Sequence, residues 1–165
     1  MVSSRPRIDA AIIREVYAHA RSTFPKECCG WLRPTQPTEH LVTPDEEGPP
    51  LEVVRCTNRQ DQLHAMDPEA HPRTAETAYA IEGKELLELT RSFDGARPAR
   101  VIYHSHPRVG AYFSAEDVRA ALAAGHDVDY LVIDCQDDHV AGAVLFRRSQ
   151  GTEAFEAIVT FPGER

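Results

Sequence analysis

The residues of this sequence best suited to catalysis lie in one short stretch, HSHPRVGAYFSAED, at positions 104–117. His104 and His106 are two residues apart, so in a β-strand both imidazoles would point to the same face of a sheet. Ser114 and Asp117 follow at the start of an expected helix, after a short loop. Two histidines and one carboxylate are a common set of zinc ligands that leaves one position open for water. The stretch therefore predicts a metal site where a strand, a loop and a helix meet.

Such a site implies a hydrolytic chemistry that needs two further groups. A water bound to zinc has its pKa lowered to roughly 7, which provides a hydroxide nucleophile at neutral pH. The reaction also needs a general base and a donor for the tetrahedral oxyanion. Glu27 is our candidate for the base, because it follows a helix and opens a short apolar strand where partial burial would raise its proton affinity. Ser114, one helical turn before Asp117, is our candidate for the donor.

Each part of this pattern also has a simpler structural explanation. Ser-x-x-Asp before an amphipathic helix is close to a capping box, so Ser114 can serve as an N-cap without any metal. An isolated His-x-His is a weak signal by itself. The joint occurrence of the pair, the loop and the carboxylate favours the site, and a capping role for Ser114 is compatible with a catalytic one.

The elements that must position these residues are those of a mixed α/β domain. Asp9 is a plausible N-cap for the first helix, and Gly125 is expected to end the helix that Ser114 begins. Residues 34–50 and 58–75 are expected to be mostly loop, and 77–81 could form a strand. We expect helices over 8–24, 83–93 and 114–125, and strands over 27–32, 51–56, 99–106, 130–135, 140–148 and 154–161. This order predicts a two-layer or three-layer α/β sandwich around one mixed sheet, in a single domain over residues 1–165.

Composition narrows the function classes. The chain has 165 residues, a net charge of −8 and a pI near 5.4, which argues against a nucleic-acid-binding protein. It contains no run of about 18 apolar residues, so we expect no membrane span. The N-terminal segment lacks the apolar region of a secretory signal. The cysteines Cys28, Cys29, Cys56 and Cys135 form no Cys-x-x-Cys, so we expect reduced, buried thiols and a cytoplasmic location.

Three segments together resemble the JAMM, or MPN-plus, motif of zinc metalloproteases. They are PKECCGWL around Glu27, YHSHP at 103–107, and the Ser-x-x-Asp that follows His-x-His after seven residues. The segment AYAIEGKELLEL at 78–89 is also similar to the middle part of that family, and the likeness spans roughly residues 8–148. Many members have proline before the serine, where this chain has Phe113, but every polar residue of the motif is present.

The resemblance implies a cytidine-deaminase-like α/β sandwich, with a mixed central sheet flanked by helices, and one Zn²⁺ per chain. By this resemblance His104, His106 and Asp117 bind the zinc, Glu27 activates water and later protonates the leaving amine, and Ser114 supports the oxyanion. The implied activity is hydrolysis of the amide bond after the C-terminal glycines of a ubiquitin-like or sulfur-carrier protein. The resemblance does not identify the substrate or the oligomeric state. It also leaves open whether the bond is an isopeptide or a linear peptide bond, and whether the enzyme needs an activating partner.

Other classes remain as alternatives. A non-catalytic scaffold of the same MPN fold would bind a protein partner, although such domains usually lack a ligand and this chain lacks none. A DNA-repair-associated relative with a similar His-x-His-Pro is disfavoured by the acidic charge and by the missing N-terminal DNA-binding segment. A zinc deaminase is excluded, because His-x-Glu and Pro-Cys-x-x-Cys are both absent.

Several other residues have expected places in the fold. Trp31 is expected in the core, Asn58 and Asp67 as cap or turn residues, and most remaining histidines on the surface. Tyr112 and Phe113 could equally touch substrate or fill the core.

Overall fold

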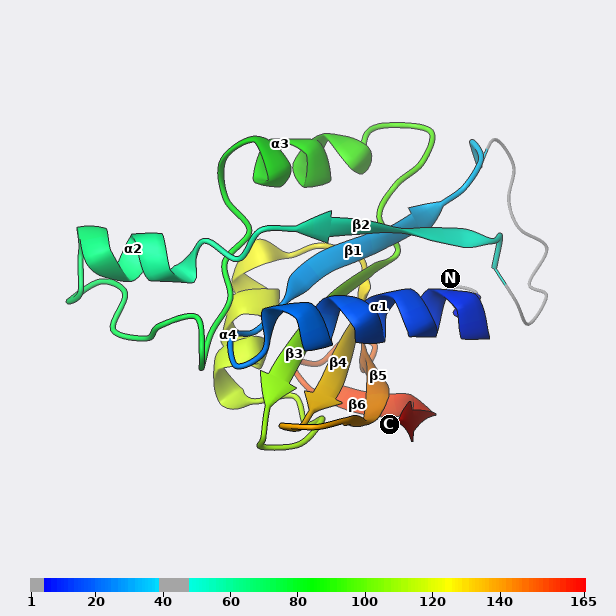
Figure 1. Ribbon diagram of the computed structural model, residues 1–165. Coiled ribbons are helices and arrows are strands. Elements are labelled where there is room, and N and C mark those ends of the chain that lie inside the picture. Colours follow the sequence, from blue (N-terminus) through cyan, green and yellow to red (C-terminus); the bar gives the residue numbers. More distant parts are fainter. Residues whose placement is uncertain (1–4, 39–47) are drawn as a thin grey trace.

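The computed structural model describes residues 5–38 and 48–165, and its centre is one six-stranded mixed sheet (Figure 1). The strands lie in the order β2-β1-β3-β4-β5-β6, and β3 and β4 are parallel while the other neighbouring pairs are antiparallel. The strands are β1 (Cys29–Pro34), β2 (Leu51–Cys56), β3 (Val101–Pro107), β4 (Asp129–Cys135), β5 (Val140–Arg148) and β6 (Phe155–Glu164). The helices are α1 (Ala10–Thr23), α2 (Gln60–Met66), α3 (Gly83–Ser92) and α4 (Ala115–Ala124). The expected mixed α/β architecture is confirmed.

Two apolar clusters cover the two faces of the sheet and define three layers. Helix α1 lies along one face, where its residues Val16 and Tyr17 pack with Leu32, Val101 and Leu131 (Figure 1). The opposite cluster includes Leu89 from α3 and Ala121 from α4, with Trp31, Ile102 and Tyr130 from the strands. The sandwich therefore has helices on both faces, and Trp31 lies in the core as expected.

Strand β3 carries the expected histidine pair and is buried along its whole length. Its odd-numbered residues Val101 and Tyr103 belong to the core under α1, whereas Ile102 belongs to the core on the opposite face. Alternation along the strand then places His104 and His106 on the face of Ile102, toward α4. The parallel pairing of β3 with β4 requires a crossover connection, and α4 provides it.

Local signals at the helix ends are as the sequence predicts. The Asp9 carboxylate accepts a hydrogen bond from the amide of Ile12 at 3.2 Å and caps α1. Ser114 caps α4 with a complete capping box, and Gly125 ends this helix in the left-handed conformation at φ 66°.

Two expectations about the elements are wrong, and a third is incomplete. Residues 58–75 are mostly loop, as expected, but they also contain α2, a short helix with only Gln60 buried, whose polar sequence has no apolar stripe to reveal it. Residues 77–81 form no strand, because their backbone bonds to the segment before α2 through Ala80 and Arg59. Strand β6 continues to Glu164, beyond the expected end at 161. The middle of the expected 34–50 loop, with His40, lies outside the described residues.

Candidate metal centre

His104 and His106, at the end of β3, meet Asp117 from the first turn of α4. The Nε2 atoms of the two imidazoles are 3.1 Å apart. Asp117 Oδ1 lies 3.2 Å from Nε2 of His104, and its Oδ2 lies 3.2 Å from Nε2 of His106. The structure therefore brings the three predicted ligands together, although they come from two elements separated by a loop.

The spacing of these donor atoms fits a zinc ion. Ligands at 2.0–2.1 Å from a tetrahedral zinc ion lie about 3.3 Å from one another. The three separations, 3.1, 3.2 and 3.2 Å, are close to that value, and the two that involve Asp117 end on different oxygens of its carboxylate, one beside each imidazole. Two nitrogens and one carboxylate also match the usual donor preference of zinc.

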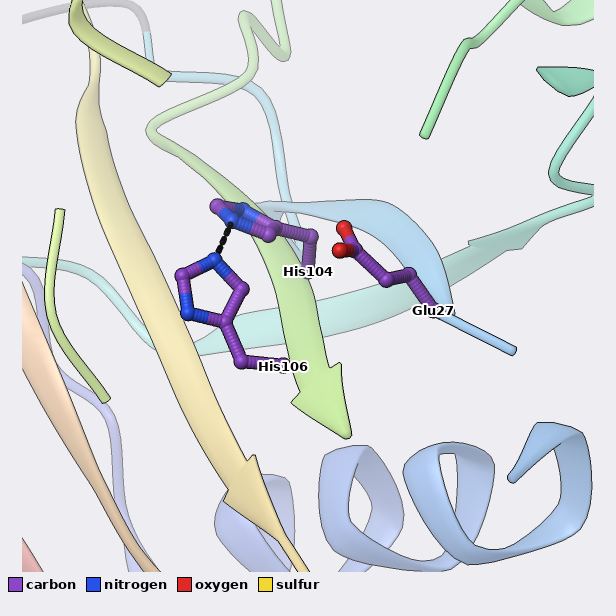
Figure 2. Close-up of side chains that lie close together, drawn as sticks. All are labelled: Glu27, His104 and His106. Carbon is purple, nitrogen blue, oxygen red and sulfur yellow. Dashed lines mark hydrogen bonds between the residues drawn. The ribbon is translucent and has the colours of Figure 1, made fainter. Parts of the chain in front are cut away.

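Glu27, just before β1, supplies a second carboxylate to the same place. Its side chain is buried, and Figure 2 shows its carboxylate directed toward the two imidazoles. The donor atoms of Glu27, His104 and His106 all lie within 4.8 Å of one another. Asp117 contacts both histidines more closely, at 3.2 Å. Two carboxylates therefore flank the same pair of imidazoles.

Electrostatics separate the two carboxylates further. Burial raises the pKa of Glu27 to about 8, with the negative charge of Asp117 adding to the effect and the charges of His106 and Arg73 opposing it. Burial also raises the pKa of Asp117, but its hydrogen bonds with His104 and His106 outweigh burial and hold that pKa far below its usual range. One carboxylate is ionised, and the other can take up and release a proton near neutral pH, as an acid–base pair requires.

The contacts behind the histidines orient their rings. Nδ1 of His106 lies 3.0 Å from the carbonyl oxygen of Gly110, so Nδ1 carries the proton and donates it there. That tautomer leaves the Nε2 lone pair facing the centre, as metal-binding histidines require. His104 is fully buried and stacks on Tyr79, with ring centroids 4.5 Å apart. Its Nδ1 has no hydrogen-bond partner among the described residues, whereas the corresponding nitrogen of a metal-binding histidine usually donates to a partner.

Ser114 combines the two explanations that the sequence allows. Its Oγ accepts a hydrogen bond from the amide of Asp117 at 3.1 Å, while its own amide donates to Asp117 Oδ2 at 2.9 Å. The capping box therefore also fixes the orientation of the Asp117 carboxylate. Ser114 lies beside Glu27, His106 and Asp117 in the lining of one cleft of about 630 Å³.

Tyr112 and Phe113 turn out to have different environments. Tyr112 is half-exposed, lines the cleft and meets the edge of the His106 ring at a centroid distance of 5.0 Å. Phe113 packs instead among Tyr130, Phe146 and Phe155. The loop between the ligands thus sends one aromatic residue to the cleft and one to the core.

Two residues that contact the histidines of the site, Tyr79 and Gly110, were not predicted from the sequence, and Asn58 makes more contacts than the predicted turn role requires. Tyr79 and Gly110 had no recognisable signal, because neither residue carries a group typical of metal sites. Asn58, expected as a turn residue, does accept from the amide of Gln60 two residues on, at 3.0 Å. Its side chain also joins three segments, since it donates to the carbonyls of Glu27 and Ala78 and accepts from the amide of Ala80.

The cysteines take no part in the centre. All four are buried and free, and burial raises the pKa of Cys28 to about 12. The expectation of a core location for Cys28, Cys29, Cys56 and Cys135 is confirmed.

A mixed α/β sandwich with two histidines and a carboxylate at the end of a central strand defines the class of this protein. The chain belongs to the family of prokaryotic homologs of the JAB domain, whose family model matches residues 9–156. This membership confirms the resemblance seen in the sequence and supports a JAMM-type peptidase in general terms.

Curated relatives and solved structures agree with this assignment. Proteins of Mycobacterium tuberculosis and Mycobacterium bovis named CysO-cysteine peptidase are 29% identical over 133 residues, which cover 80% of this chain and 75% of theirs. A solution structure from Desulfitobacterium hafniense superposes with a TM-score of 0.57 at 20% identity, covering 90% of this chain and 86% of that one. One from Salinibacter ruber gives 0.54 at 19% identity, covering 92% and 87%. These two likenesses establish the fold.

Proposed function

We propose that this chain is a zinc-dependent peptidase that hydrolyses the amide bond after the C-terminal glycines of a ubiquitin-like or sulfur-carrier protein. The observation that carries the proposal is the close approach of His104, His106 and the Asp117 carboxylate, beside the buried carboxylate of Glu27. In this proposal His104, His106 and Asp117 hold one Zn²⁺ per chain, and residues 1–165 form one catalytic domain.

In this proposal Glu27 transfers the protons and Ser114 stabilises the negative charge of the oxyanion. A bound zinc ion would act as a Lewis acid, lowering the pKa of water and polarising the scissile carbonyl. Glu27 takes the proton of the attacking water, and its raised pKa lets it hold that proton until the amide bond breaks. It then delivers the proton to the leaving amine. Ser114 Oγ, whose described hydrogen bond uses it as an acceptor, keeps its proton for the developing oxyanion.

The substrate class follows from the relatives and the cleft. The mycobacterial relatives are named CysO-cysteine peptidase. By analogy, we propose that the substrate of this chain is a carrier protein whose C-terminus is joined to an amine. The cleft lined by Glu27, His106 and Ser114 has a volume of about 630 Å³, and we propose that it accepts the peptide tail of the carrier. The four free cysteines fit a reducing compartment, so we place the enzyme in the cytoplasm. No helix in the described part of the chain has both the length and the apolarity needed to cross a membrane.

The first test is the zinc content per chain, measured by elemental mass spectrometry on the wild type and two variants. We expect about one zinc in the wild type, and less than a tenth of that in His106→Ala, because one of three protein ligands is removed. The matched control is His139→Ala, which changes a histidine on the turn between β4 and β5 and should keep its zinc. Circular dichroism confirms that all three proteins are folded.

The outcome separates the proposal from its alternative. A wild type without zinc after reconstitution would refute the metallopeptidase and leave the non-catalytic scaffold as the better explanation. Zinc at full occupancy in His106→Ala would show that the metal binds elsewhere.

A further inference from the structure

The cleft is lined by a positively charged side chain, Arg73, that has no role in the proposed reaction. Arg73 lies in the exposed segment between α2 and α3 and lines the cleft together with Glu27 and His106. The carbonyl of Ala75, two residues after Arg73, accepts a hydrogen bond from the backbone amide of Glu27 at 2.7 Å. This bond holds the segment that carries Arg73 beside Glu27, and the charge of Arg73 accordingly lowers the pKa of that carboxyl against the stronger effect of burial.

Arg73 differs from the other arginine of the cleft in having no carboxylate partner among the described residues. Arg119 forms an ion pair with Glu116 on α4. The hydrogen bond of Arg73 is a long one, from Nη1 to the carbonyl oxygen of Thr77 at 3.3 Å. This bond orients the side chain and leaves most of its N–H groups available. A guanidinium with free donors binds a carboxylate through two parallel hydrogen bonds.

The place of Arg73 indicates which part of a substrate it would meet. In the proposed reaction Glu27 delivers a proton to the leaving amine, so the leaving group must lie beside Glu27. In an amino acid the carboxyl carbon is only about 2.5 Å from the amine nitrogen. A cation beside Glu27 is thus well placed for the carboxylate of a leaving amino acid. Glu69 and Glu76 also line the cleft, and Arg73 and Arg119 are the arginines of its lining.

We propose that Arg73 binds the α-carboxylate of a single amino acid that is attached through its amine to the glycine tail of the carrier. This inference rests on the proposed function and narrows it from amide bonds in general to bonds before one terminal amino acid. In the reaction, water adds across the amide: the carbon–nitrogen bond breaks, a carbon–oxygen bond forms, and the products are the carrier carboxylate and the free amino acid. An isopeptide to a lysine side chain presents no such carboxylate and is a poorer substrate.

The test uses two substrates that differ only at that carboxylate. One is a sulfur-carrier protein ending in Gly-Gly extended by one cysteine, and the other is the same protein extended by cysteinamide. For the zinc-loaded wild type we expect kcat/KM to be at least tenfold higher for the free acid. For Arg73→Ala the ratio should fall to about one, because the acid loses its partner. The rate on the amide shows whether the variant is folded and competent.

Two further variants complete the test. Arg73→Lys keeps the charge without the planar fork and should retain part of the preference, whereas Arg119→Ala should retain all of it. The inference is overturned if the wild type cleaves both substrates equally, or if Arg73→Ala keeps the wild-type ratio. If the zinc-loaded wild type cleaves neither substrate, the proposed function itself fails, and this inference with it.

Discussion

Strand β3 separates a single buried histidine, His19, from a buried pair, His104 and His106. His19 lies on the inward face of α1, with its Nδ1 atom 2.6 Å from the hydroxyl oxygen of Tyr103. On the α4 face, His104 and His106 meet the carboxylate of Asp117. Tyr103 and His104 are neighbours in sequence, yet alternation along the strand sends them to these opposite sides.

The comparison shows that the partners of a buried histidine can offset the effect of burial on its pKa, as they do at His106, although at His104 burial still lowers the pKa despite the contact with Asp117. Burial, aided by the charge of Arg55, lowers the pKa of His19 to about 4, so this imidazole stays neutral beside a neutral phenol. Burial also disfavours the charged form of His106, but the negative charges of Asp117 and Glu27 outweigh it and raise the pKa. The α4 face thus concentrates the negative charge that attracts a cation, and the α1 face does not.

The strongest test of this difference removes the charge of Glu27 while leaving the histidines in place. We expect Glu27→Gln to lower kcat on the carrier substrate by about 10³-fold, because general acid–base catalysis contributes roughly 10²–10⁴-fold. Zinc content should stay near that of the wild type, since Glu27 is not among the proposed ligands. Single-turnover cleavage and elemental mass spectrometry on the same samples provide the two measurements.

Glu76→Gln is the matched control, because it removes a carboxylate from the exposed lining of the same cleft. It should change kcat by less than a few-fold. Full activity in Glu27→Gln would show that another group is the base, and loss of zinc in that variant would make Glu27 a ligand.

Much of the site and fold could be predicted because the signals are local. His104 and His106 are two residues apart on one strand, and Ser114 and Asp117 are one turn apart at a helix start, so their relative geometry depends on a few dihedral angles. The strand β2 has the predicted ends, and its alternation and boundaries also depend only on nearby residues. Glu27 lies far from the others in sequence; its place before a short apolar strand suggested it, and the family resemblance supported that choice.

The supports that were missed depend on contacts between distant segments. Tyr79 stacks on His104 only after the loop before α3 folds back over β3, and Asn58 reaches Glu27 across 31 positions of the chain. His19 was expected on the surface with most other histidines and is in fact buried. His19 lies three residues after Val16, on the inward face of α1. This helical spacing indicates a buried position, but histidine is a polar residue and was therefore expected on the surface.

A smaller effect is expected at Ser114, where capping and catalysis can be separated. Ser114→Ala should lower the free energy of unfolding by about 1 kcal/mol through loss of the N-cap. It should also lower kcat by about 10²-fold if the hydroxyl donates to the oxyanion. Ser114→Thr keeps a hydroxyl and a capping side chain and should recover most of both quantities. Urea unfolding and steady-state kinetics measure them separately, and an alanine variant with reduced stability but unchanged kcat would make Ser114 a cap alone.

The smallest effect tests the other side of the comparison, through the pH dependence of stability. The pKa of His19 is about 4 in the folded protein and near its ordinary 6.5 in the unfolded chain. Between these values the unfolded state binds the proton and the folded state does not, so the free energy of unfolding falls as the pH is lowered from 6.5 to 4. Above pH 6.5 the imidazole is neutral in both states, and this contribution vanishes.

His19→Asn should remove that dependence, because asparagine can still bond to Tyr103 but does not titrate. One pKa unit corresponds to about 1.4 kcal/mol, so the difference between wild type and variant should change by up to about 3 kcal/mol across this range. Urea unfolding at matched pH values measures it, and comparing the two proteins cancels the carboxylates that titrate in both. Zinc content should be the same in both proteins at pH 7. If His19→Asn lost its zinc, the two faces of β3 would be coupled, and the contrast between His19 and the proposed metal ligands His104 and His106 would have to be abandoned.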